Sequence, residues 1–392
     1  MLSKLLKLLI LAVILSSCAK NMDKQNKDQS SKLPSEMEDK ANKSTSKEEN
    51  EKDYSKLGID KTELKIPKLK TIQFGDKSTE EIISFFEKYK VKFFENDRKV
   101  DGFIENQDGN LVSIDKFDED KFPSEPSLAW YVYKDKLYML ITPMETSEKS
   151  DLSLYILDKS GEVEKKTLIE NINELAPLFV YDSNKLYYSS DTGDGKSILA
   201  MIDLDDYSIT KLKEYDFTKE ADLYKGPIIT QLAKFDDDIV YQLSSFDNKN
   251  VRDEKARENK LLSLTNPNKE IDLSDKTFEY MKKLGRYIVC HPKSNKDCQE
   301  PVEIYDEDFK LILKLKNNPI ERLVDTALLN RDGKAYLLIK DSLATHYLID
   351  LADNEENYQL NNISTVGRDL SSIDNKLVLN LSDATYIGYI DE

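Results

Sequence analysis

Short apolar runs separated by turn-forming residues recur from Trp130 to the end of the chain. A clear example is the stretch 179–212, which contains nothing helical. Its three predicted strands are Leu186–Ser189, Ile198–Asp203 and Ser208–Leu212. The turns around them are rich in Asp, Asn, Ser and Gly, which tolerate left-handed or Asx-turn backbone. A unit of this size cannot bury its own faces, so we interpret it as one blade of a repeat protein.

The first tight turn of this unit recurs at intervals of roughly 40 to 55 residues, and such a period indicates a repeat architecture. The turn segments are Tyr133–Tyr138, Asp182–Tyr187, Asp236–Tyr241, Gly285–Cys290, Asp332–Leu337 and Asp374–Leu379. The third strand recurs too, at Leu154–Leu157, Leu199–Leu204, Lys260–Leu264, Pro301–Tyr305, His346–Leu351 and Tyr386–Ile390. Three or four strands per period favour a β-propeller over a sandwich.

We predict an all-β chain that forms a six-bladed propeller. The last unit ends just after its third strand, so an earlier segment has to supply the outer strand and cover the open edge. The candidates are Leu64–Phe74 and Leu111–Phe117, the second of which follows the hairpin signal Asp108-Gly109. Seven blades are the alternative, if Val91–Phe117 forms a blade of its own rather than completing the last one.

The segment Ser189–Asp205 resembles the middle of a TolB-type propeller repeat. A strand, a Gly/Asp turn and a run that ends in an apolar-Asp-Leu-Asp step follow one another there. The turn Asp182-Ser183-Asn184 departs from the Ser-Pro-Asp-Gly form typical of that family. The resemblance covers one blade clearly and the others in outline, and it implies a fold and a scaffold role but no chemistry.

Residues 1–18 have the pattern of an export signal. Lys4 and Lys7 precede an apolar run that is too short to span a bilayer stably. The end of this segment, 15–18, resembles a lipobox, in which the thiol of Cys18 receives a diacylglyceryl group. The alternative is a plain signal peptide that contains a cysteine by chance. The lipobox predicts a lipid-anchored bacterial lipoprotein on the extracytoplasmic face of the cell membrane.

Residues 19–60 consist mostly of charged and polar residues, so we expect a disordered tether. The propeller domain is then 61–392, of which 61–120 holds a helix and the closing strands. The helix is predicted at Ser78–Tyr89, because Ser78 or Thr79 can cap it and Ile82, Phe85, Phe86 and Tyr89 form an apolar stripe. We expect this stripe to pack on the propeller. The charged segment Asn250–Lys260 is predicted to be an exposed insertion in the third blade.

The chain has a formal net charge of −17, with 74 acidic and 57 basic residues. This charge argues against nucleic acid as a partner, because phosphate backbones attract basic proteins. After Cys18, two cysteines remain, Cys290 and Cys298, in the fourth repeat. An extracytoplasmic pair in this place can form a disulfide that staples a hairpin. Two free thiols are the alternative.

No catalytic motif stands out in the sequence. The only histidines are His291 and His346, and His346 lies in an alternating strand where a surface or core role is expected. Most acidic clusters fall in turns and Trp130 is the only tryptophan, so a carbohydrate-active enzyme is disfavoured. The stretch Asp191–Gly195 resembles part of a calcium loop but lacks a distal bidentate Glu, so we interpret it as a turn. We expect no catalytic residues, no metal and no cofactor.

The leading hypothesis is a membrane-anchored, extracytoplasmic propeller that acts as a protein-interaction platform for an envelope protein. The alternative is a solute- or glycan-binding lipoprotein that holds its ligand in the central channel. A carbohydrate-active enzyme is the third hypothesis.

Overall fold

The computed structural model divides the chain into two compact units, 1–52 and 53–392, and all described residues belong to the second. The structure describes residues 63–66, 69–96, 103–106, 108, 110–113, 127–141, 150–172, 178–220, 223–246, 256–273, 276–293, 300–317, 319–352, 356–363, 369–373, 376–381 and 384–390. The predicted signal peptide, the lipobox with Cys18 and the predicted tether therefore lie outside the described residues. None of the helices in the described part is both long and apolar enough to cross a bilayer.

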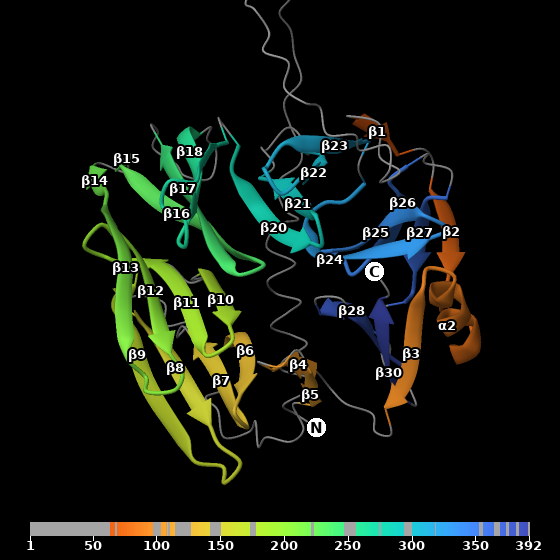
Figure 1. Ribbon diagram of the computed structural model, residues 1–392, viewed down its shortest axis with the longest axis horizontal. Coiled ribbons are helices and arrows are strands. Elements are labelled where there is room, and N and C mark those ends of the chain that lie inside the picture. The colour runs from red at the N-terminus through yellow and green to blue at the C-terminus, as the bar shows by residue number, and fades with distance from the viewer. Residues whose placement is uncertain are drawn as a thin grey trace, which may run out of the picture. The chain divides into compact units, whose positions relative to one another are not determined.

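Six antiparallel sheets form the blades of a propeller, and the first strand of each blade is innermost (Figure 1). Blade 1 contains β6 (Ser127–Tyr133), β7 (Lys136–Ile141), β8 (Ser150–Leu157) and β9 (Val163–Ile172). Blade 2 contains β10 (Leu178–Asp182), β11 (Lys185–Asp191), β12 (Lys196–Asp203) and β13 (Ile209–Asp216). Blade 3 contains β16 (Pro227–Phe235), β17 (Asp238–Phe246), β18 (Ala256–Ser263) and β19 (Glu270–Asp272). Blade 4 contains β20 (Phe278–Leu284), β21 (Tyr287–Pro292), β22 (Val302–Tyr305) and β23 (Leu311–Lys316). Blade 5 contains β24 (Leu323–Arg331), β25 (Lys334–Asp341), β26 (His346–Asp350) and β27 (Tyr358–Asn361). Blade 6 contains β28 (Asp369–Ile373), β29 (Lys376–Asn380) and β30 (Thr385–Ile390). The prediction of six blades is confirmed.

The fourth strand of blade 6 comes from the N-terminal part of the domain, as expected. It is the beginning of Val91–Phe117, and neither Leu64–Phe74 nor Leu111–Phe117 supplies it. The strand β3 (Val91–Asn96) pairs antiparallel with β30. The candidate Leu64–Phe74 instead contributes β1 (Glu63–Lys65) and β2 (Lys70–Gln73), which add in parallel to the outer strands of blades 4 and 5. Both candidates were wrong because apolar pattern marks a strand but does not choose its partner.

Two small hairpins lie outside the blades. One joins β4 (Phe103–Glu105) to β5 (Leu111–Ser113), and the other joins β14 (Thr218–Glu220) to β15 (Leu223–Lys225). The candidate Leu111–Phe117 therefore begins in a hairpin, and its residues after Ser113 lie outside the described ones. Ile104 of the β4–β5 hairpin packs against Leu137 and Met139 of blade 1.

Hydrophobic side chains fill the spaces between successive blades. One pair of residues from each shared cluster illustrates this, in order from the interface of blades 1 and 2 to that of blades 5 and 6. The pairs are Leu154 with Ile202, Leu199 with Tyr241, Leu261 with Ile288, Val289 with Leu337, and Leu338 with Leu379. Among the described residues, no such cluster joins blade 6 to blade 1, and the β4–β5 hairpin covers blade 1 instead. The core is thus distributed around the ring rather than gathered at one centre.

The helix of the described part of the chain, α2 (Thr79–Glu87), begins where the sequence predicts. Ser78 is its N-cap, and the Ser78 side chain and Glu81 form a capping box. Ile82, Phe86 and Tyr89 are buried in the cluster shared by blades 5 and 6, so the predicted packing on the propeller is confirmed. In the chain, α2 connects β2 to β3, and it lies beside both strands in Figure 1.

The expected insertion in blade 3 is partly wrong. Residues Ala256–Lys260 belong to β18, and Asn259 is buried. Glu258 is exposed whereas the adjacent Asn259 is buried, so a buried position of this segment is polar and gives no apolar alternation in the sequence. Residues 250–255 of the same segment lie outside the described ones.

Candidate functional site

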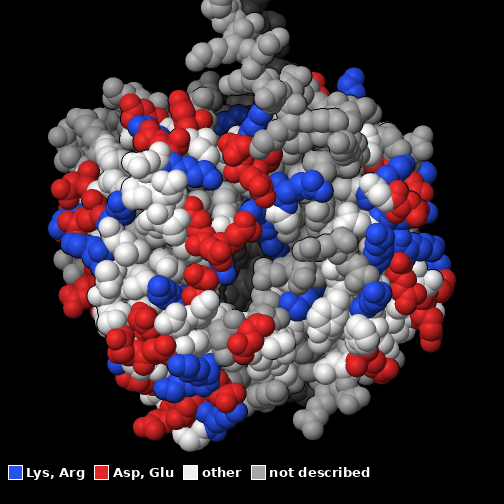
Figure 2. Space-filling model, viewed as in Figure 1, with Lys and Arg blue, Asp and Glu red and all other residues white. Residues whose placement is uncertain are grey.

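A large depression lies at the end of the innermost strands where the first turn of each blade is found. Its volume is about 1040 Å³. Figure 2 shows this face hollowed near its middle, with acidic and basic side chains around the hollow. The lining comes from the strand ends and turns of blades 3, 4 and 5, with Val180 from blade 2, Ile390 from the end of β30 in blade 6, and Lys90 from just before β3. We call this hollow the turn-side depression.

The turns that line the depression need unusual backbone. Asp236, Gly285, Asp332 and Gly333 all have positive φ angles, between 51° and 78°. A Cβ atom built on Gly285 or Gly333 would meet nothing within 4 Å, so these glycines serve the turn conformation and not a close packing contact. The tight turns place the following and preceding side chains at the rim. This is how short local signals in three separate repeats meet at one site.

Basic side chains outnumber acidic ones in the lining, although the chain as a whole is acidic. The five basic residues are Lys90, Lys234, Lys282, Lys283 and Arg286, and the two acidic ones are Asp236 and Asp237. Three of the lysines have acidic partners. Lys283 pairs with Asp236, and Lys234 lies 2.9 Å from the Asp182 carboxylate.

Lys282 bridges two blades. Its ammonium lies 3.3 Å from Asp325 and donates to the Thr326 carbonyl at 3.1 Å. The same Thr326 carbonyl accepts a hydrogen bond from the Ser372 hydroxyl at 2.9 Å, and Ser372 N–H donates to Asp325 at 2.7 Å. The innermost strands β20, β24 and β28 are therefore connected by polar contacts beside the depression.

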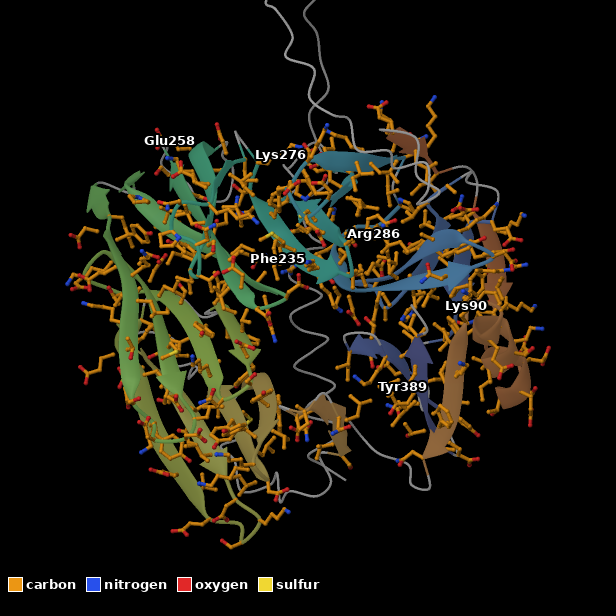
Figure 3. The ribbon with its side chains drawn as sticks, viewed as in Figure 1. Lys90, Phe235, Glu258, Lys276, Arg286 and Tyr389 are labelled. Carbon is orange, nitrogen blue, oxygen red and sulfur yellow. The ribbon has the colours of Figure 1, made fainter. Side chains whose placement is uncertain are left out.

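Arg286 and Lys90 have no acidic partner within the described ranges. Arg286 follows Gly285 in the turn after β20, and Lys90 immediately precedes β3 (Figure 3). Both residues are exposed. They are available to a ligand in a way that Lys283, Lys234 and Lys282 are not.

The floor of the depression is apolar. Leu232, Ala233, Met281, Leu284 and Tyr287 all line it and are at most 8% exposed. Such a floor, with a few polar groups at its rim, is the usual composition of a ligand-binding cleft. The depression can hold an apolar body while charged groups at its rim orient it.

Both histidines are buried at joints between blades rather than in the depression. His291 Nδ1 lies 3.3 Å from the Leu323 amide nitrogen and 3.0 Å from Glu279. His346 Nε2 donates to the Leu370 carbonyl at 2.9 Å, and its Nδ1 is buried without a hydrogen-bond partner. Burial lowers the pKa of His346 to about 4, because a proton on Nδ1 would find no acceptor. The expectation of a surface or core role for His346 is confirmed as a core role.

Cys290 is buried in β21 and lies opposite Glu303 of β22. Its predicted disulfide partner, Cys298, lies outside the described residues, so the disulfide stays a prediction. Glu303 is 1% exposed, and its carboxylate lies 2.7 Å from Lys276 and 2.9 Å from Lys314. Burial would raise the pKa of Glu303, but hydrogen bonds from Lys276, Tyr305 and Lys314 hold it below its ordinary value. This ion cluster joins β22 and β23 to Lys276, which lies just before β20.

The stretch Asp191–Gly195 forms a turn between β11 and β12. Thr192 bonds to Asp194, and the Gly195 amide donates to the Thr192 carbonyl at 3.1 Å. In the described part of the chain, no group of three or more His, Cys, Asp or Glu residues could hold a metal ion. The interpretation of this stretch as a turn is confirmed.

The sequence analysis offered the central channel as a ligand site, but it named residues of the depression such as Asp236 and Gly285 only as turn positions and assigned none of them to a site. A signal was nevertheless present: Lys282, Lys283 and Arg286 flank the Gly285 turn, whereas most turns of this chain are acidic. This basic cluster was overlooked because Lys282 and Lys283 belong to β20, whose apolar residues were interpreted only as a strand of the core.

No protein-family model and no curated protein matches the chain. Among solved structures, the acylaminoacyl peptidase of Pyrococcus horikoshii is similar, at 14% identity over 67% of this chain and 50% of that one, with a TM-score of 0.34. The chain thus matches half of the peptidase's length. The propeller domain of the Trilobed protease from Pyrococcus furiosus is similar at 13% identity, over 68% of this chain and 95% of that one, with a TM-score of 0.33. An oligogalacturonate lyase in complex with manganese is similar at 10% identity, over 77% and 96%, with a TM-score of 0.37. These likenesses concern the fold alone.

Proposed function

We propose that the chain is a membrane-anchored, extracytoplasmic β-propeller that acts as a protein-interaction platform and holds its partner at the turn-side depression. The lipobox ending at Cys18 and the polar segment 19–60 support the anchoring. The propeller fold supports a binding role, because its rigid blades present turns from separate repeats on one face.

The depression is the observation that carries the proposal. It gathers side chains from several blades around an apolar floor, and two of its cations, Arg286 and Lys90, have no acidic partner among the described residues. Exposed cations without an acidic partner contribute little to the stability of the fold. Unpaired charge and apolar surface in one concave place are the features from which binding sites are built.

Site-specific photocrosslinking in cells tests the platform. A photoreactive residue at Asn330, which lines the depression, should give a discrete adduct. The same residue at Lys213, which is exposed on the outer strand β13, is the matched control. A photoreactive residue placed at Arg286 should also give an adduct. Adding Asn330→Trp to this chain should remove that adduct, because the indole would fill part of the depression. Equal adducts from both positions would contradict the proposed site.

The anchor is tested separately from the binding site. Cys18→Ser should release the protein from the membrane fraction or leave it as an unprocessed precursor, because no thiol remains to receive the lipid. Metabolic labelling with a fatty-acid analogue should mark the wild-type chain only. Labelling of the Cys18→Ser variant would contradict the lipobox.

A second candidate is a solute- or glycan-binding lipoprotein, and the size of the depression favours it. A volume of about 1040 Å³ is at the upper end of the range for small-molecule sites. A ligand present at 100 times its Kd should stabilise the folded chain by about 2.7 kcal/mol. Thermal-shift screening against sugars and peptides, with the Asn330→Trp variant as control, separates this candidate from a platform that binds protein alone.

The proposal assigns the chain no enzymatic activity. The described lining of the depression contains no His, Cys, Ser or Thr, and its Asp236 carboxylate is paired with Lys283. Release of reducing sugar from cell-wall material by the purified protein would contradict this part of the proposal.

A further inference from the structure

We propose that the turn-side depression selects ligands with one anionic group, a carboxylate or a phosphate monoester, attached to an apolar body. Arg286 is the main contact of the anionic group in this proposal. The inference rests on the second proposed function, a small ligand in this depression, and it adds the chemical class of that ligand.

The charge around the depression favours a single anionic group. The five basic lining residues face two lining acids. Three of these lysines also pair with acids outside the lining: Lys234 with Asp182, Lys282 with Asp325, and Lys283 with Glu307 at 3.6 Å. Five bases and five acids leave the site close to neutral. A polyanion would be repelled by the acids, whereas one anionic group can reach a free cation.

Arg286 is the cation best suited to this contact. Its guanidinium can hold a carboxylate or phosphate through two parallel hydrogen bonds. It lies in the turn beside Gly285, next to the buried Leu284 and Tyr287 of the floor. An anionic group bound there keeps the rest of the ligand over apolar surface. Lys90 is a point charge at the blade 6 side and adds weaker, less directional attraction.

Asp237 sets the orientation of the ligand. It lines the blade 3 side of the depression and has no ion pair in the part of the chain that the structure describes. Its charge disfavours an anionic group on that side. A ligand with one anionic group should therefore bind with this group toward Arg286 and its apolar body toward Leu232 and Ala233.

Three ligands with the same aromatic body test the proposal by isothermal titration of the full chain in detergent. They are 2-naphthoate, 2-naphthyl phosphate and the neutral 2-naphthamide. We expect the wild-type chain to bind at least one of the two anions roughly tenfold more tightly than the amide, as a charge-assisted contact of about 1.4 kcal/mol gives. Arg286→Gln should lower this ratio about fivefold, to roughly two, and Lys90→Gln should lower it about twofold, because a point charge at the rim is screened by water and salt.

Arg322→Gln is the matched control. Arg322 is exposed and precedes β24, so it lies at the opposite end of that strand from the turn at Gly333, and it should leave the ratio unchanged. Equal affinities for anion and amide in the wild-type chain, absence of binding by all three ligands, or equal losses in Arg286→Gln and Arg322→Gln would each overturn the proposal.

The Asn330→Trp variant separates this proposal from the function on which it rests. If Asn330→Trp abolishes binding of all three ligands but Arg286→Gln leaves the ratio intact, the depression is a ligand site and only its selectivity has been misassigned. If Asn330→Trp leaves binding intact, the ligands bind elsewhere and the depression fails as a site. The ratio of affinities is informative even where a variant weakens all binding equally.

Discussion

The two halves of the propeller are built differently. Blades 1 to 3 consist of strands that follow one another in the sequence, whereas blades 4 to 6 each receive one strand from residues 63–96. These strands lie beside the C-terminal blades in Figure 1, although about 250 to 300 residues separate them in the chain. The halves thus depend on contacts of different range: local hairpins in one, and long-range pairing in the other.

The difference has an energetic consequence. The N-terminal segment contributes buried side chains to the clusters of blades 4 to 6, together with the aromatic group around Phe74, Phe85 and Phe86. Blades 1 to 3 receive none of these. We expect the stability of the C-terminal half to depend on the N-terminal segment, and the following experiments test this expectation from the largest effect to the smallest.

Truncation before residue 97 should have the largest effect. It removes β1, β2, α2 and β3, and with them the buried side chains Leu64, Ile66, Phe74, Ile82, Phe86, Tyr89 and Val91. At about 1.5 to 3 kcal/mol for each buried side chain, the loss is comparable with the whole stability of a typical domain. Hydrogen exchange should show loss of protection in β28, β29 and β30.

Truncation before residue 53 is the control, because it removes none of the described elements. It should leave the unfolding midpoint unchanged. Retained protection in blade 6 after the longer truncation would show that β3 is dispensable.

Phe86→Ala should lower the free energy of unfolding by about 3 to 5 kcal/mol. The Phe86 ring is fully buried between blades 5 and 6 and lies 5.2 Å from the Phe85 ring and 6.2 Å from the Phe93 ring. Phe94→Ala, at a ring that is 59% exposed, should cost less than about 1 kcal/mol. Denaturant unfolding of the two variants measures both, and similar losses would argue against α2 as a core element.

His346 should make the joint between blades 5 and 6 sensitive to acid. Its pKa is about 4 in the folded chain and about 6.5 when unfolded, so the unfolded state binds more protons between these values. The stabilising effect of the neutral ring is present above pH 6.5 and is lost as the pH falls toward 4, by at most roughly 3 kcal/mol. His346→Gln should flatten the fall in unfolding midpoint over this range. An unchanged pH profile would assign the acid sensitivity to other groups.

Gly388→Ala should disturb the pairing of β3 with β30 and cost about 1 to 3 kcal/mol. A Cβ atom at Gly388 would lie 2.6 Å from Val91 Cγ1 and 2.7 Å from the Phe93 ring. Phe93 is the cross-strand partner of Gly388, so its ring covers the glycine directly. Gly285→Ala serves as comparison. A Cβ atom at Gly285 would have no neighbour within 4 Å, but the φ angle there is positive, so this variant measures backbone strain without steric overlap. Thermal unfolding of the two variants measures this, and no change in Gly388→Ala would mean that β3 shifts freely.

Asp191 should give blade 2 the opposite pH response to that of His346, with a smaller effect. Burial raises the pKa of Asp191 to about 6, so the folded state binds more protons than the unfolded state between pH 3.8 and 6. The associated stability is present below pH 3.8 and is lost as the pH rises through 6, by about 1 kcal/mol for a partly exposed side chain. Asp191→Asn should not show this loss between pH 4 and 6.5. A parallel decline in both chains would contradict the raised pKa.

The local features of the fold could be read from the sequence because a few neighbouring residues determine each of them. The Ser78–Glu81 capping box marks the start of α2, and the turn after each first strand is marked by Asp, Asn or Gly. The repeat of these signals was enough to predict six blades. The contribution of Ala256–Lys260 to β18 was missed because its charged residues gave no apolar alternation.

The sequence by itself determined the repeating strands, their turns and the capped helix, because each depends on contacts within a few residues. Only the tertiary structure decided that Val91–Asn96 joins the last blade, that β1 and β2 extend blades 4 and 5, and that Arg286 and Lys90 line one depression. These features join residues far apart in the chain, and many strands with the same apolar pattern could have competed for the same edges. In the observed arrangement, α2 is buried between blades 5 and 6 and β3 pairs with the edge of β30, and both contacts depend on packing around the ring.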